Sequence, residues 1–258
     1  MSVKQLFDLS NRVAIITGGS RGLGLQMAEA LGELGAKLVL SARKANELEE
    51  AHAQLTKLGY DVMTIPADIG KVEVIQPLVD AVMARHGRID ILVNNAGATW
   101  GANAEDHSLD AWNKLIAVNL TGAFLLSQAV GRASMIPNRY GRIINIASVA
   151  GLGASPPQMG GTLAYNTTKG GLVNFTRQLA AEWGRYNITV NAICPGFFPS
   201  RMTRSTLAAH EKFFVDLTPM GKLGGDEDLK GAVALFASNA GGHITGQTLA
   251  VDGGAIVV

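Results

Sequence analysis

The sequence predicts an α/β fold, in which a doubly wound parallel sheet of seven strands is flanked by helices. Short apolar runs that fit buried strands alternate with longer segments of helical periodicity from residue 13 to residue 251. The 258 residues are 47% hydrophobic and 17% charged, which suits one large core. Because no linker, repeat or low-complexity segment interrupts this pattern, we expect a single domain over residues 1–258.

The composition argues against several classes of function. The net charge of +1 does not suggest a nucleic-acid partner, and no run of eighteen apolar residues predicts a membrane span. The N-terminus lacks the apolar core of a signal peptide, and the single cysteine, Cys194, cannot form an internal disulfide. The five histidines lack metal-ligand spacing. We therefore expect a cytoplasmic protein without a metal, a membrane or a nucleic-acid partner.

The first strand, residues 13–17, leads into a glycine-rich turn, residues 18–24, and then into a helical pattern from about residue 25 to 34. This order is typical of a Rossmann-type dinucleotide site, where glycines let the backbone approach a pyrophosphate and the helix N-terminus binds its charge. Gly18-x-Ser20-x-Gly22 also matches the nucleophile elbow of α/β-hydrolases. That elbow normally follows several strands, whereas this turn follows the first, so we expect a dinucleotide.

The second strand, residues 37–41, ends in Ser41-Ala-Arg43-Lys44. A carboxylate that binds the ribose 2′-hydroxyl of NAD normally lies about 20 residues beyond the glycines. This stretch offers two cations instead, and with Arg21 they suit a 2′-phosphate. We therefore expect NADP(H) rather than NAD(H), although Arg43 and Lys44 could simply be solvated residues before the helix of residues 45–58.

The next strands, residues 62–65, 89–93 and 142–147, alternate with helices at residues 72–86 and about 109–135. The strands lead into Asp68, Asn94 and Ser148, at the carboxyl ends where ligands bind in open parallel sheets. An alternative for Asp68 is a helix N-cap. Asn119 interrupts the apolar pattern of the second helix, and a buried asparagine needs hydrogen-bond partners. It could hold a structural bond or a catalytic water.

The helix expected from Tyr165 to Trp183 begins with Tyr165-x-x-x-Lys169, so the phenol and the ammonium share one helix face. A nearby positive charge favours the phenolate and lowers a pKa that starts near ~10. Such a tyrosine could act as a general acid or base. A sixth strand at residues 189–193, a helix at residues 227–237 and a strand at residues 248–251 complete the alternation.

Together these segments resemble the short-chain dehydrogenase/reductase family over essentially the whole chain. The resemblance rests on an ordered set of motifs: Thr17-Gly18-x-x-x-Gly22-x-Gly24, Asn94-Asn-Ala-Gly97, Asn119, Ser148, Tyr165-x-x-x-Lys169 and Pro195-Gly196. The sequence is similar to the branch that contains 3-oxoacyl-carrier-protein reductases and gluconate 5-dehydrogenases.

The resemblance implies a role for each matched residue. Tyr165 would exchange the proton with the substrate oxygen, Lys169 would lower its pKa and bind the nicotinamide ribose, and Ser148 would hydrogen-bond the substrate. Asn119 would hold a water that links Lys169 to solvent. The implied cofactor contacts are Gly18, Gly19, Ser20, Arg21, Gly22, Leu23, Arg43, Asp68, Ile69, Asn94, Ala96, Gly97, Tyr165, Lys169, Pro195, Gly196, Phe198 and Ser200.

The reaction implied is hydride transfer between NADP(H) and a ketone or secondary alcohol, with a homotetramer as the family's assembly. Apolar residues expected around the substrate are Trp100, Leu152, Met159, Phe197, Met202, Phe213 and Phe214, with a mobile lid over about residues 197–225. The cations of that segment, Arg201, Arg204 and Lys212 with His210 as a further candidate, could steer an anionic tail. These features favour a carbonyl or 3-oxoacyl reductase, for which an acyl thioester is a candidate substrate. The alternatives are a gluconate 5-dehydrogenase-like enzyme and a non-catalytic NADP(H) sensor.

Overall fold

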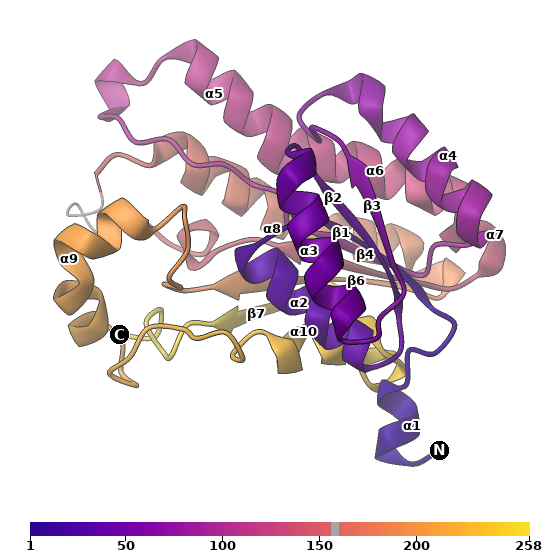
Figure 1. Ribbon diagram of the computed structural model, residues 1–258. Coiled ribbons are helices and arrows are strands. Elements are labelled where there is room, and N and C mark those ends of the chain that lie inside the picture. Colours follow the sequence, from indigo (N-terminus) through magenta and orange to yellow (C-terminus); the bar gives the residue numbers. More distant parts are fainter. Residues whose placement is uncertain (156–159) are drawn as a thin grey trace.

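A computed structural model of the chain, which describes residues 1–155 and 160–258, contains one seven-stranded parallel sheet (Figure 1). Its strands are β1 (Val13–Thr17), β2 (Lys37–Ala42), β3 (Val62–Pro66), β4 (Ile91–Asn94), β5 (Gly141–Ile146), β6 (Ile188–Pro195) and β7 (Thr248–Val251). The order across the sheet is β3-β2-β1-β4-β5-β6-β7. The predicted doubly wound α/β fold is confirmed, and the order reverses between β1 and β4.

Helices cover both faces of the sheet because successive strand residues point to opposite sides. The helices are α1 (Val3–Phe7), α2 (Gly22–Glu33), α3 (Ala45–Lys57), α4 (Ile75–His86), α5 (Leu109–Ile116), α6 (Gly122–Val130), α7 (Ile136–Asn138), α8 (Leu163–Trp183), α9 (Arg204–Leu217) and α10 (Lys230–Ala237). In β1, Ala14 and Ile16 pack with α2, α3 and α10, whereas Val13 and Ile15 pack with α4, α6 and α8. Both clusters are fully apolar, so the sheet is buried on each face.

The long helix predicted at residues 109–135 runs over residues 109–138, and two wide π-helical turns, Ala117–Thr121 and Gly131–Met135, interrupt it. With a mean hydropathy of 1.3, it is long and apolar enough to cross a membrane, a test that core helices of water-soluble proteins also pass. Its buried side chains Leu126 and Val130 pack with strand residues in the core. The helix therefore forms one layer of the α/β fold.

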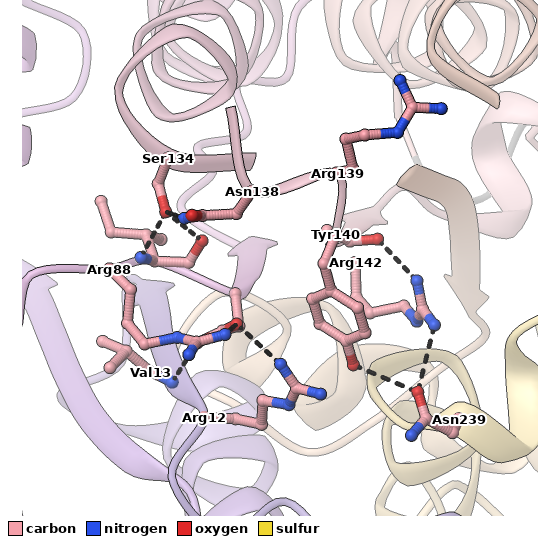
Figure 2. A network of polar contacts seen from close by, with 12 residues as sticks. Arg12, Val13, Arg88, Ser134, Asn138, Arg139, Tyr140, Arg142 and Asn239 are labelled. Carbon is pink, nitrogen blue, oxygen red and sulfur yellow. Dashed lines mark hydrogen bonds and ion pairs between the residues drawn. The ribbon is translucent and has the colours of Figure 1, made fainter. Parts of the chain in front are cut away.

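A polar network ties together the amino ends of the central strands (Figure 2). The buried carboxylate of Asp90 accepts hydrogen bonds from the backbone N–H of Val13 and from the side chains of Arg12 and Arg88. The ring of Tyr140 lies between two guanidinium groups, 3.8 Å from that of Arg12 and 4.4 Å from that of Arg142. Buried charges need partners of this kind, so the network stabilises the sheet edge opposite to the carboxyl ends.

Two local features differ from the sequence prediction. The first turn of the chain forms the short helix α1, where Ser2 and Gln5 cap each other's backbone N–H groups. The fourth strand begins at Ile91 rather than residue 89, because the backbone N–H and carbonyl oxygen of Ile89 both bond to the Ser134 hydroxyl. Strand ends are the least certain part of a pattern-based prediction.

Candidate active site

A cleft of about 560 Å³ lies at the carboxyl ends of the strands, across the point where the strand order reverses. It collects most of the residues predicted for the cofactor and the reaction. These are Gly18, Ser20, Arg21, Gly22, Leu23, Arg43, Asp68, Ile69, Ala96, Gly97, Ser148, Tyr165, Lys169, Pro195, Gly196, Phe198 and Ser200. Segments up to about 180 positions apart in the sequence thus share one wall.

Three predicted residues, Gly19, Asn94 and Asn119, do not line the cleft but lie behind its wall. Gly19 packs under the glycine turn, where an added Cβ would lie 2.9 Å from the Ile16 carbonyl oxygen. The Asn94 side chain is buried between strands and donates to Asn145 at 2.9 Å. It is the next residue, Asn95, that lines the cleft and donates to the carbonyl oxygens of the glycine turn.

The glycine turn leaves an open backbone surface at the start of α2. Gly22 has φ +52°, and within residues 1–155 and 160–258 no atom lies within 4 Å of where its Cβ would stand, so its backbone faces free space in the cleft. Gly24 allows close packing instead, because an added Cβ would clash with the Gly18 carbonyl. This cradle at a helix N-terminus fits the pyrophosphate of a dinucleotide, as the sequence predicts.

The residues predicted to take part in proton transfer converge at the other end of the cleft. Lys169 is 4% exposed, its Nζ lies 5.7 Å from the centroid of the Tyr165 ring, and it donates to the Ile146 carbonyl oxygen at 2.7 Å. Ser148 is almost buried at the end of β5, and its hydroxyl accepts from the backbone N–H of Ala150 at 3.2 Å. The arrangement brings a phenol, a hydroxyl and an ammonium to one apolar corner, as expected.

Burial corrects one expectation about these groups. The pKa of Tyr165 is raised above its ordinary value because the phenolate would be desolvated, and a hydrogen bond with Ser148 opposes this only in part. The predicted lowering by Lys169 is therefore not found in the protein alone. Burial also lowers the pKa of Lys169 to about 8 and raises that of the Cys194 thiol to about 11. At neutral pH the phenol carries its proton, which suits a general acid.

Asn119 lies in the first π-helical turn and is almost fully buried. Its amide accepts from the backbone N–H of Ala98 at 2.8 Å, donates to the Ala98 carbonyl at 2.9 Å and donates to the Thr168 hydroxyl at 3.0 Å. The side chain therefore joins the loop after β4 to α8, next to Lys169. A water relay through Asn119 stays a prediction, because the amide itself is already used by protein groups.

Three of the four aromatic residues expected around the substrate pack against one another, and none of the three lines the cleft. Phe197 stacks on Phe214 with ring centroids 3.8 Å apart, Phe213 meets Phe214 edge-on, and Phe214 is fully buried. They form the core of the segment after β6 rather than a ligand wall, so this expectation is wrong for these three. Met202 does line the cleft, whereas Met159 lies outside the described residues.

Two of the cations expected to steer the anionic tail of a substrate form ion pairs within the protein instead. Lys212 pairs with Asp216 one turn along α9 at 2.6 Å, and Arg201 pairs with Glu47 of α3 at 3.4 Å. Both cations therefore already have a carboxylate partner, and neither is reserved for the anionic tail of a substrate. Glu47 and Arg201 both line the cleft, although the sequence did not predict either of them as a cofactor contact. Glu47 lies beyond the end of β2, where the sequence pattern places the residues that contact the ribose.

Comparison with known proteins agrees with this geometry. A family model described as short chain dehydrogenase matches residues 12–211. The gluconate 5-dehydrogenase of Gluconobacter oxydans (strain 621H) is 38% identical over 100% of this chain and 99% of that protein. The 3-oxoacyl-[acyl-carrier-protein] reductase FabG of Escherichia coli (strain K12) is 37% identical over 97% of this chain and 100% of its own.

Among solved structures, a gluconate 5-dehydrogenase from Burkholderia cenocepacia J2315, in complex with NADP and tartrate, superposes with a TM-score of 0.94 and 36% identity. The match covers 100% of both chains. The resemblance drawn from the ordered motifs is confirmed, including the branch of the family. The chain therefore belongs to the short chain dehydrogenase family of oxidoreductases.

Proposed function

We propose that the protein interconverts a ketone and a secondary alcohol with NADP(H), and that Tyr165 exchanges the proton. The observation that carries this proposal is the convergence of Tyr165, Ser148 and Lys169 beside a glycine cradle in one cleft. NADPH supplies the hydride when it is bound. The Tyr165 hydroxyl donates its proton to the substrate oxygen as negative charge develops there.

The other residues position these groups. The Ser148 hydroxyl hydrogen-bonds the same oxygen and so stabilises the developing charge. The Lys169 ammonium, held by the Ile146 carbonyl, faces the Tyr165 ring and favours the phenolate left behind. In the direction of alcohol oxidation the same phenolate accepts the hydroxyl proton.

The adenosine end supports NADP(H) over NAD(H). Arg21, Arg43 and Lys44 line the cleft beyond β2, and guanidinium groups bind phosphate through charge-assisted hydrogen bonds. The family relatives whose solved structure contains NADP support the same choice. Arg43 is the proposed contact for the 2′-phosphate, with Asp68 and Ile69 beside the adenine.

For the substrate we propose a carbonyl or 3-oxoacyl compound, with a sugar acid as the second candidate. Val118 and Met202 give the cleft apolar walls, which bury apolar ligand surface. The relatives support both classes, since one is a 3-oxoacyl reductase and another a gluconate 5-dehydrogenase. A steady-state assay of NADPH oxidation with a panel of ketones tests the function, and no turnover of any ketone would contradict it.

We also propose that the protein is a homotetramer in the cytoplasm. Leu109, Phe124 and Leu163 are large apolar residues that stay 70%, 43% and 47% exposed on the helices α5, α6 and α8. Exposed apolar patches often mark protein interfaces. These residues support a self-association surface, and the homotetramer is the assembly in which we propose that copies of the same chain cover it.

A further inference from the structure

The adenosine end of the cleft holds a carboxylate among its cations. Three cationic groups converge on one oxygen, Oε1 of Glu47: Arg21 Nη1 at 2.5 Å, Lys44 Nζ at 3.1 Å and Arg201 Nη1 at 3.4 Å. The Glu47 side chain is 17% exposed, whereas each cation is about half exposed or more. Several N–H donors around one anionic oxygen are also what a bound phosphate requires.

These cations come from three parts of the fold. Arg21 belongs to the glycine turn, Lys44 caps α3, and Arg201 belongs to the segment between β6 and α9. All three line the cleft together with Arg43, which is exposed beside them. Glu47 therefore bridges the two sides of the cleft at the end where a 2′-phosphate is expected.

We infer that Glu47 is a specificity-determining residue, whose carboxylate competes with the cofactor 2′-phosphate for Arg21, Lys44 and Arg201. The inference rests on the proposed NADP(H) function. It adds that Glu47 limits how strongly the protein prefers NADP(H) over NAD(H). A cofactor with a 2′-phosphate must share these cations with an anion that is already in place. A cofactor with a 2′-hydroxyl does not need them, so Glu47 narrows the difference in affinity between NADP(H) and NAD(H).

Two simpler roles for Glu47 predict different results. As an acid in the first turn of α3, it could merely stabilise the helix N-terminus. Its replacement would then lower stability without changing cofactor preference. As an organiser of the cations, it could instead strengthen phosphate binding, and its replacement would weaken it.

The test is calorimetric titration of the full chain with 2′,5′-ADP and with 5′-AMP, which differ only by the 2′-phosphate. In Glu47→Gln the dissociation constant of 2′,5′-ADP should fall about fivefold, about 1 kcal/mol, while that of 5′-AMP changes less than twofold. Arg201→Gln should weaken 2′,5′-ADP binding and leave 5′-AMP binding unchanged. Glu49→Gln is the matched control, because Glu49 is exposed and about 200° around the same helix from Glu47.

If Glu47→Gln behaves like the Glu49 control, or binds 2′,5′-ADP more weakly than the wild type, the inference is wrong. Glu47→Asp provides a second variant, since its shorter side chain withdraws the carboxylate and should shift affinity the same way by less. A wild type that binds 5′-AMP but does not bind 2′,5′-ADP would overturn the proposed NADP(H) function itself. That result is distinct from failure of the Glu47 inference, in which the wild type still binds 2′,5′-ADP.

Discussion

Replacing the buried lysine of the cleft should make the protein alone more stable while it removes activity. Burial lowers the pKa of Lys169 to about 8, from an ordinary value of 10.5. This difference means that holding the ammonium in the folded protein costs about 3 kcal/mol at neutral pH. Lys169→Met removes that cost but also loses the hydrogen bond to the Ile146 carbonyl, worth about 1–2 kcal/mol. We therefore expect the free energy of unfolding of the variant at pH 7 to be about 1–2 kcal/mol higher than that of the wild type.

The pH dependence is the sharper measurement. Below pH 8 the folded and unfolded chains both carry the Lys169 ammonium, so the wild type bears the full cost. Between pH 8 and 10.5 the folded chain releases the proton while the unfolded chain keeps it, so the free energy of unfolding rises with pH. From pH 7 to 9.5 the wild type should gain about 2 kcal/mol relative to Lys169→Met.

Urea unfolding at fixed protein concentration, followed by circular dichroism at several pH values, gives these free energies. Lys114→Met is the control, because Lys114 is exposed on α5 and its replacement should leave the wild-type pH profile unchanged. Parallel profiles for the wild type and Lys169→Met would refute the reasoning, since they would mean that Lys169 is not buried as a charged group.

Four further outcomes are expected. Tyr165→Phe should lower kcat by at least ~10²-fold with NADPH affinity kept, and a variant with a third of the wild-type turnover would exclude the proton role. Ala42→Asp combined with Arg43→Ala should move preference toward NADH in kcat/KM, because a contact between a guanidinium and the 2′-phosphate worth ~1.5–3 kcal/mol is lost; a wild type that already prefers NADH would contradict the cofactor proposal. With NADPH at fixed pH, β-keto esters or acyl thioesters should give a higher kcat/KM than 5-ketogluconate, and the reverse order would favour the sugar-acid class. Light scattering should give about four times 27.0 kDa, whereas a monomer mass would exclude the tetramer.

The sheet and the phosphate cradle could be predicted because each depends on local sequence. A short run dominated by apolar residues, such as β1, fits a strand that is buried on both faces, and its four apolar residues and Thr17 are all buried. The glycine turn must follow such a strand and precede a helix, and these three elements are adjacent in the chain. Because the strands are parallel, their order in the sheet then places the polar residues predicted at the strand ends along one side of the sheet.

Other properties of the site depend on contacts between distant segments, which a single sequence does not reveal. The ion pair of Glu47 with Arg201 joins residues 154 positions apart. The raised pKa of Tyr165 follows from desolvation by the surrounding fold, whereas spacing along the helix showed only the nearby ammonium. In the same way, the sequence after β6 predicts apolar residues around the substrate, whereas in the structure the rings of Phe197 and Phe214 stack on each other.

The reversal of strand order between β1 and β4 has a consequence for how the protein folds. Ala14 pairs with Leu38, 24 positions on, but on its other side with Ile91, 77 positions on. Such distant parallel pairing must pay for a long closed loop before it gains contacts, so it forms slowly. During synthesis the glycine turn therefore stands at an unfinished sheet edge until residue 91 has emerged. A bound nucleotide can stabilise the folded chain only after β4 has paired with β1, because before that step only one side of the cleft exists.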